Sequence, residues 1–498
     1  MKPGRDRSLV TTGLILGMAM AALEGTAVAT AMPTAIADLG GVSRYSWVFS
    51  AYLLTSTTTV PLFGKLADLY GRQRIYQVSV IVFLLGSGLS GAARTMNQLI
   101  LFRALQGIGA GGVQPISLTL VGDIFTLEER GRMQGLFSGV WGVSSLVGPA
   151  LGGLITDWIS WRWVFYLNLP VGIASGLLLR LYLREASVRT KHSLDIAGTV
   201  ALTLSITLLL AALLEGSARW GLASPITLGC VALAAVGMVL FVWQETRAEE
   251  PMLPLDLFRT RVIAVASAGN AVIGTLLLAA SAYVPMFAQG VIGGTATDAG
   301  MTLATMSIGW PIASAISGRL LLRIGYRRLV VLGGAVAALG CGLLTLAGAG
   351  TTRVALSLTM GVLGVGLGFM ATPFLVAVQN AVPWSRRGVA TSATQFFRTI
   401  GGAIAVAVFG AMLNRTLAPV LGPGGNVDAA LEPAQRHLMD PAALAHLLSG
   451  LERGLHQIFL GFALIALIGL VLSWFFPAGS AASLAHADAR GQGPAEAS

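Results

Sequence analysis

The sequence predicts an all-α polytopic membrane protein with two six-helix bundles and two inserted helices. The 498-residue chain is 55% hydrophobic and only 11% charged, whereas soluble proteins are about 25% charged. Apolar stretches of roughly 20 residues, the length that crosses about 30 Å of hydrocarbon, recur from end to end. One motif also occurs twice, at corresponding points of the two halves.

Hydropathy predicts about fourteen membrane spans. Most of the 32 Lys and Arg residues, about 22, fall on one side of the membrane and about 8 on the other. This bias places both termini in the cytoplasm and the protein in the cell inner (cytoplasmic) membrane as a multi-pass protein. The spans are expected near 9–31, 46–64, 75–93, 97–121, 135–156, 164–183, 194–215, 223–243, 262–288, 300–322, 329–349, 354–378, 389–413 and 456–476.

The spans divide the chain into four parts. Residues 1–184 are expected to form the N-terminal six-helix bundle, and 185–261 an inserted helix pair with its flanking cytoplasmic loops. Residues 262–476 are expected to form the C-terminal six-helix bundle, including an external loop, 414–455, that covers the last helix pair. Residues 477–498 have the composition of a disordered cytoplasmic tail.

The repeated motif follows the second and the tenth span, as GKLADLYGRQR (64–74) and GRLLLRIGYRR (318–328). Each copy is expected to end a helix and turn tightly at the inner surface. A motif repeated in both halves indicates a transporter of two parallel repeats with its cargo site at the midplane. The copies align without gaps, Leu322 standing opposite Asp68, through the pairs Gly64 and Gly318, Gly71 and Gly325, and Arg74 and Arg328.

The charges of the first copy predict a gate at the inner surface. Asp68 can accept hydrogen bonds from a neighbouring helix N-terminus or pair with an arginine across the halves, and so hold the cytoplasmic side closed. Arg72 and Arg74 are part of the same loop. The alternative is a set of solvated loop charges.

Glu24 is an acidic side chain well inside a predicted span, about 22 Å from its inner end. A carboxylate at that depth usually lines a cavity or a proton path, and desolvation disfavours its charged form. Arg103 lies at a similar depth in the fourth predicted span, so we expect these two residues to serve proton coupling. The alternatives are a Glu24 that is only hydrogen-bonded to neighbouring helices and an Arg103 that anchors helices through backbone carbonyls.

A substrate cavity is expected among polar and aromatic groups in otherwise aliphatic spans, because these groups suit an amphipathic cargo. Each of them can also be a packing residue. With one acid and two arginines in the membrane, the composition does not favour a cationic cargo. The candidates are Tyr52, Asn270, Trp310, Phe396, Phe397 and Arg398.

Small residues form a close-packing face on the fifth predicted span. Ser144, Gly148 and Gly152 recur every four residues, which lets another helix approach closely. Pro149 removes one backbone donor and bends a helix, and Gly153 extends the small-residue cluster. Such a helix can seal a proton leak and act as a pivot; generic close packing is the alternative.

Other classes of function are disfavoured. Gly107–Gly112 fit GxGxxG inside an apolar span without a preceding strand, so they predict a packing face and not a dinucleotide loop. No histidine pair lies inside a span, and we expect no metal, no cofactor and no enzymatic activity. The +10 net charge is spread over short loops, so nucleic acid is not an expected partner. The two cysteines lie in apolar segments, and no disulfide is expected.

These motifs together resemble those of the fourteen-helix drug:proton antiporters of the major facilitator superfamily, over nearly the whole chain. GKLADLYGRQR resembles the loop motif after helix two, LFRALQGIGAGG (101–112) the helix-four motif, and GVWGVSSLVGPALGGLI (139–155) the antiporter motif of helix five. LEGTAVATAMP (23–33) resembles the first-helix motif, which usually has Asp where this chain has Glu24. SWRWVFYLNLPVG (160–172) is similar to a segment common in the same subgroup.

The resemblance implies a multidrug efflux protein, and the sequence predicts proton-coupled export of amphipathic small molecules by alternating access. The expected partners are substrate, protons and the lipid bilayer, with the protein acting as a monomer. One alternative is a dedicated exporter of a single metabolite, antibiotic or lipid. A second, from another class, is a non-transporting membrane sensor or scaffold, and a passive channel is a third.

Overall fold

The computed structural model describes residues 5–39, 45–183, 195–216, 220–221, 223–294, 296–421 and 441–478, and these form helices and short connections with no strand among them. The helices are α1 (Arg5–Leu39), α2 (Tyr45–Tyr70), α3 (Arg72–Gly91), α4 (Met96–Ile124), α5 (Leu127–Trp158), α6 (Arg162–Tyr166), α7 (Asn168–Tyr182), α8 (Ile196–Glu215), α9 (Pro225–Glu245), η3 (Leu255–Arg259), α10 (Arg261–Gly290), α11 (Ala296–Ile324), α12 (Tyr326–Leu344), α13 (Arg353–Asn380), η4 (Trp384–Arg386), α14 (Arg387–Leu421) and α17 (Pro441–Trp474).

Eleven helical segments in the described part of the chain are long and apolar enough to cross a membrane, with α6 and α7 counted as one segment. The apolar part of α8, Ala197–Leu213, is shorter. An all-helical membrane protein is therefore confirmed. The count of fourteen spans stays a prediction.

Two further long helices, α2 and α4, pack against each other. Thr55 Oγ1 of α2 donates to the Ala104 carbonyl of α4 at 2.8 Å. A Cβ added to Gly107 would lie 2.1 Å from Thr55 Oγ1, and one added to Gly111 would lie 2.1 Å from Thr59 Oγ1. The GxGxxG stretch is thus a helix-packing face, as expected.

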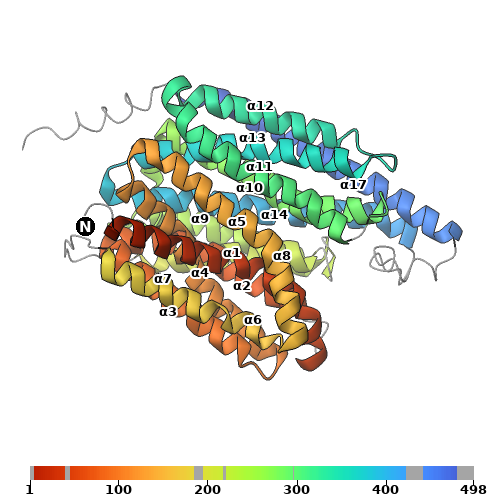
Figure 1. Ribbon diagram of the computed structural model, residues 1–498, viewed down its shortest axis with the longest axis horizontal. Helices are drawn as coiled ribbons and strands as arrows, with labels where there is room; N and C mark the ends of the chain where they lie inside the picture. The colour runs from red at the N-terminus through yellow and green to blue at the C-terminus, as the bar shows by residue number, and fades with distance from the viewer. Residues whose placement is uncertain are drawn as a thin grey trace, which may run out of the picture.

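The helices from α1 to α7 pack mainly among themselves, as do those from α10 to α17. Figure 1 shows the first set in red to yellow and the second in green to blue, side by side with their helices roughly aligned. The two sets meet where α2 and α4 contact α14 and where α5 contacts α11. The α8–α9 pair packs on itself, and α8 contacts α2 and α14 at the junction.

The repeated motif has the same geometry in both copies. Gly71 (φ 94°, ψ 137°) separates α2 from α3, and Gly325 (φ 79°, ψ 171°) separates α11 from α12. These backbone conformations are accessible essentially to glycine alone. Each glycine therefore lets one helix end and the next begin without a longer loop.

The observed helix ends differ from several predicted boundaries. The external loop expected over 414–455 is helical at both ends, where α14 continues to Leu421 and α17 begins at Pro441. Hydropathy measures only the apolar part of a helix, and the end turns of α14 and α17 are too polar to be included in it. Residues 422–440, the 184–194 junction between the first two expected domains, and 479–498 of the expected tail lie outside the described residues.

The two turn glycines generate a stability prediction. Replacing Gly71 or Gly325 by alanine forces a Cβ into a glycine-only conformation, which costs about 1–3 kcal/mol. We expect each variant to lower the apparent melting temperature in detergent. Gly342→Ala is the control, because Gly342 lies within α12 and an added Cβ would meet nothing within 4 Å. Equal melting temperatures for G71A, G325A and G342A would contradict the role of these turns.

Candidate functional site

Glu24 is buried and ion-paired inside the first helix set. Its side chain is fully buried, and its carboxylate forms an ion pair with Arg103 of α4. Asn168 of α7 donates a hydrogen bond to the other carboxylate oxygen through Nδ2. The structure therefore brings together the two residues expected to serve proton coupling and adds an amide that the sequence analysis missed.

Arg103 makes polar and aromatic contacts with α2 and with its own helix. Its Nε donates to the Val48 carbonyl at 3.3 Å and its Nη1 to Gln106 Oε1 at 2.7 Å. The guanidinium also lies over the Tyr52 ring, 4.2 Å from its centroid. These contacts fix the cation from α2 and from its own helix, so the pairing geometry does not depend on Glu24 alone.

Asn168 begins α7, directly after Leu167, whose backbone is still helical (φ −55°, ψ −31°). Pro170 has no backbone N–H, so it cannot donate to the carbonyl four residues earlier, and one helical hydrogen bond is missing there. Asn168 Nδ2 then also lies 3.0 Å from Ser87 Oγ. The sequence Asn-Leu-Pro at 168–170 could have indicated a role for Asn168, because an asparagine two residues before a proline is unusual in an apolar span.

The small-residue face of α5 packs against α1 immediately beyond Glu24. A Cβ added to Gly148 would lie 1.9 Å from Thr26 Oγ1, and one added to Gly152 would lie 2.5 Å from the Ala27 carbonyl oxygen. Thr26 Oγ1 also donates to the Ser144 carbonyl at 3.1 Å. Gly153 faces open space and Pro149 is exposed, so neither takes part in this packing.

Asp68 joins the two helix sets at the end of the molecule that carries Gly71 and Gly325, here called the motif side. It accepts hydrogen bonds from the backbone N–H groups of Gly388 (2.9 Å) and Val389 (2.8 Å) at the start of α14. Arg72, itself 1% exposed, pairs with Asp68 at 3.1 Å and donates to the Trp384 carbonyl at 2.6 Å. A carboxylate at a helix N-terminus is favoured by both the free N–H groups and the helix dipole.

A second repeat, missed by the sequence analysis, completes this contact. DIFTLEERG (123–131) and NAVPWSRRG (380–388) share the pattern Asp/Asn, six residues, Arg-Gly. Arg387 of α14 pairs with Asp123 of α4 at 3.4 Å, and Arg130 of α5 donates to Asn380 Oδ1 of α13 at 2.6 Å. Each arginine therefore reaches the polar residue of the other set.

Close helix contacts accompany these bonds. A Cβ on Gly131 of α5 would lie 2.0 Å from the Gly318 Cα of α11, and one on Gly64 of α2 would lie 2.1 Å from Ser392 Oγ of α14. Gly64 and Gly318 are equivalent glycines of the two motif copies, and each therefore lies at a contact between the two helix sets. Arg74 is exposed and lies outside this set of contacts.

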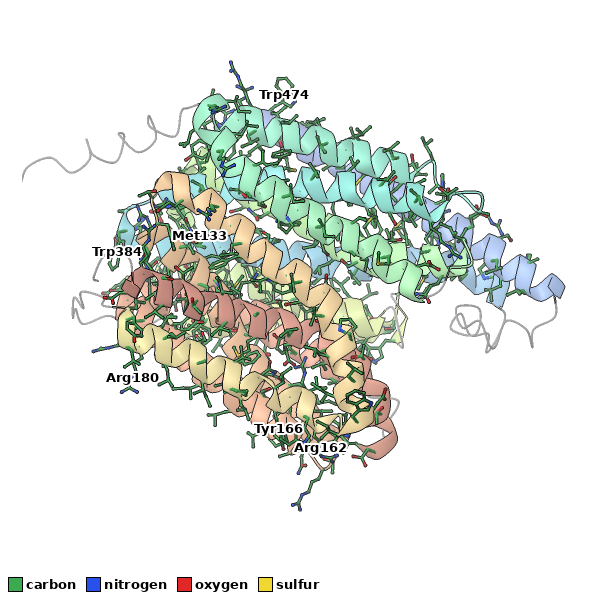
Figure 2. The ribbon with its side chains drawn as sticks, viewed as in Figure 1. Met133, Arg162, Tyr166, Arg180, Trp384 and Trp474 are labelled. Carbon is green, nitrogen blue, oxygen red and sulfur yellow. The ribbon has the colours of Figure 1, made fainter. Side chains whose placement is uncertain are left out.

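The ion pairs at the opposite end join helices of the same set. Asp38 pairs with Arg162 at 2.6 Å within α1–α7, and Asp298 pairs with Arg353 at 3.1 Å within α10–α17. The Arg162 guanidinium holds the pKa of Asp38 below its ordinary value. Figure 2 shows Trp384 of the motif side and Arg162 at opposite ends of the molecule.

Between these ends, a small cavity lies at the junction of the two sets. It contains Asn270 and Arg398, two of the residues expected in a substrate cavity. Residues of α4, α5, α10, α13 and α14 line it: Leu118, Gln134, Asn270, Ala371, Leu375, Thr394, Gln395 and Arg398.

The four aromatic candidates lie outside the lining of this cavity. Tyr52 stacks on Arg103, and Trp310 is packed in the core of α10–α17. Phe396 and Phe397 contact each other at 5.6 Å and belong to a cluster with α8 and α9. Aromatic character alone could not tell these packing residues from cavity residues, because both occur in apolar helices.

Comparison with known proteins identifies the family. Residues 14–406 match the model of the Major Facilitator Superfamily. The chain belongs to this superfamily. It is 39% identical to the multidrug transporter protein MdtP of Bacillus subtilis over 408 residues, covering 82% of this chain and 75% of MdtP. It is 35% identical to multidrug resistance protein 3 of the same organism over 480 residues, covering 93% of each.

A solved structure agrees on the fold. That of the human organic anion transporter MFSD10 (TETRAN) has a TM-score of 0.63, covers 95% of this chain and 100% of its own, and is 14% identical. At that identity the likeness concerns the fold alone. The sequence relatives place this superfamily member among proteins named as multidrug transporters, as the sequence motifs indicated.

The α1–α5 contact predicts opposite outcomes for two glycines of one motif. Gly148→Val places a side chain against Thr26 and should lower both the apparent melting temperature and the transport rate, overpacking costing about 1–3 kcal/mol. Gly153→Val, which meets open space, should leave both close to wild type. Thermal unfolding in detergent and efflux from proteoliposomes measure the two effects. A G153V defect as large as that of G148V would contradict this assignment.

The motif-side bonds predict a change in conformational balance. Asp68→Asn removes the charge from the start of α14, worth about 1–2 kcal/mol, which shifts the ratio of closed to open molecules about 5- to 30-fold. Spin labels at the exposed positions Arg74 and Arg328 should then report longer distances. Leu322→Asn, at the equivalent position of the second repeat, is the control. An unchanged distance distribution for D68N would show that Asp68 does not hold this side closed.

Proposed function

We propose that the chain exports amphipathic small molecules across the cytoplasmic membrane by proton antiport and alternating access. In this proposal α1–α7 and α10–α17 are two six-helix bundles, α8–α9 is the inserted pair, and all fourteen segments span the membrane. The motif side and both termini face the cytoplasm, and the protein works as a monomer.

The buried Glu24–Arg103 pair is the observation on which this proposal rests. Taking two charges out of water costs several kcal/mol each, which their attraction offsets only with good geometry and further hydrogen bonds. Arg103 and Asn168 supply these to Glu24. A proton that reaches Glu24 removes its charge, weakens its hold on Arg103 and changes the balance between conformations. Proton binding and helix rearrangement are then linked at one carboxylate.

The set of inter-bundle contacts supports a conformation closed on the cytoplasmic side. Asp68, Asp123 and Asn380 each bind a group of the other bundle on the motif side. The ion pairs Asp38–Arg162 and Asp298–Arg353 at the opposite end lie within single bundles. In the proposed cycle this conformation presents an ionised Glu24 to protons from outside, and protonation favours substrate release.

The same α5 helix connects the coupling site with the gate. Its Gly148 and Gly152 pack against α1 beside Glu24, while Arg130 and Gly131 contact α13 and α11 on the motif side. A change in the packing of α1 is therefore transmitted along α5 to the gate.

A dedicated exporter of one metabolite, antibiotic or lipid is the second candidate function. Two relatives named multidrug proteins favour a broad substrate range. A growth-inhibition profile in a host stripped of its own pumps separates the two, since resistance to unrelated compounds indicates multidrug export. Membership of a transporter superfamily disfavours the sensor or scaffold interpretation.

Charge removal at position 24 tests the coupling. In proteoliposomes with an imposed pH gradient, we expect Glu24→Gln to abolish gradient-driven efflux because the neutral amide cannot exchange a proton. Either single variant, E24Q or R103Q, breaks a buried pair and should lower stability by about 3–5 kcal/mol.

The double variant E24Q/R103Q separates coupling from folding. It leaves no unpaired charge, so it should recover stability relative to R103Q while efflux remains independent of the gradient. Recovery of gradient-driven efflux in the double variant would show that the Glu24–Arg103 pair has a structural role only. Glu452→Gln, remote from this site, controls for the loss of an acidic residue.

A further inference from the structure

Arg398 lies in the middle of the proposed membrane span and has no partner among the residues that the structure describes. It lies about 16 Å from the start of α14 at 1.5 Å per residue, about half the hydrocarbon thickness. Within the described part of the chain, its guanidinium makes no hydrogen bond, ion pair or aromatic contact. Intramembrane arginines almost always pair with an acid or with backbone carbonyls, so Arg398 needs a partner that the described residues do not provide.

Arg103 shows what a satisfied arginine looks like in the same protein. Its guanidinium contacts Glu24, Gln106 and the Val48 carbonyl. The two arginines have the same chemistry, but Arg103 is buried and fully paired, whereas Arg398 is half-buried and lines a cavity. The two arginines therefore differ in their pairing, and the one without a described partner is the one that lines the cavity.

The polar groups around Arg398 form a set suited to an acceptor ligand. Gln134 of α5 and Gln395 of α14 line the same cavity, are 8% and 5% exposed, and have no side-chain hydrogen bond to another described residue. Each can donate two N–H bonds, and Arg398 can donate five but accept none. The eight lining residues include no carboxylate.

The backbone that carries Arg398 is fixed by close helix packing. A Cβ on Gly274 of α10 would lie 1.7 Å from the Arg398 carbonyl oxygen, and one on Gly401 would lie 2.6 Å from the Ala271 carbonyl oxygen. Thr275 Oγ1 donates to the Gly401 carbonyl at 3.1 Å. The α10–α14 contact thus holds the arginine at the junction of the two bundles, where both can contact a ligand.

We propose that this cavity binds the anionic group of an amphipathic weak acid, with Arg398 as its counter-ion and Gln134 and Gln395 as further donors. A carboxylate or sulfonate satisfies the guanidinium through paired, charge-assisted hydrogen bonds. Leu118, Ala371 and Leu375 form the apolar part of the lining. In this closed conformation the cavity is small and has room for the polar group alone, so binding of the whole molecule requires the cavity to widen. The inference rests on the proposed export function and narrows its substrate class.

Binding of three matched probes to the purified full chain in nanodiscs tests this. The probes are naphthylacetate (anionic), naphthylacetamide (neutral) and naphthylmethyltrimethylammonium (cationic), titrated by calorimetry. We expect naphthylacetate to bind about tenfold or more tightly than the neutral amide, the range of hydrogen bonds to a charged group. Arg398→Gln should remove this preference, and Arg398→Lys should retain part of it.

Controls separate the site from folding and from the coupling scheme. Gln134→Leu should weaken naphthylacetate binding without removing its preference over the cation, and it keeps the test valid if R398Q does not fold. Arg180→Gln, at an exposed arginine that Figure 2 shows pointing away from the helices, should leave all three affinities unchanged.

Three outcomes would overturn the proposal: no preference of wild type for naphthylacetate over the neutral amide, tighter binding of the cationic probe by wild type, or an anion preference that survives in R398Q. Because binding needs no pH gradient, failure here is distinct from failure of proton coupling. Loss of gradient-driven efflux in E24Q with naphthylacetate binding intact would leave the anion site standing. Normal coupling without an anion preference would refute the anion site alone.

Discussion

Charge in a water-poor interior is the constraint on which this structure depends. Every buried charge needs a partner, because the hydrocarbon around the helices supplies none. Glu24 is matched by Arg103 and Asn168, and Asp68 by Arg72 and the start of α14. These pairings decide which helices lie side by side, since α1, α4 and α7 meet at one carboxylate and α2 and α14 meet at the other.

Glycine makes these pairings sterically feasible. Gly64 against α14 and Gly131 against Gly318 bring the backbones of different bundles close together. Backbones that approach so closely gain dispersion contacts and bring short polar side chains into reach. The contacts hold only while the helices remain in register, so a small rotation of one helix set breaks many of them together. The proposed gate therefore opens as a unit.

The two repeats are related in their packing but differ in their polar chemistry. Asp68 caps α14 in trans, whereas Leu322, its counterpart, is exposed. The start of α5 needs no such partner, because Thr126 and Glu129 form a capping box there. Likewise Arg387 meets the charged Asp123, but Arg130 meets the neutral Asn380. The charged contacts between the sets are concentrated at α14, the helix that also carries Arg398, so the proposed substrate site and the proposed gate share one element.

The sequence by itself determined the long apolar helices, the tight turns at Gly71 and Gly325, the packing face around Gly148 and the place of Glu24 inside an apolar helix. These follow from local properties: apolar length, backbone freedom and side-chain size. Which residues meet was decided by tertiary structure. Asn168 reaches Glu24 because α7 packs against α1, and Phe396 packs against α8 while Arg398, two residues on, faces the cavity. Residues two apart on a helix point about 200° apart. Hydropathy does not distinguish such residues, but they pack against different parts of the molecule.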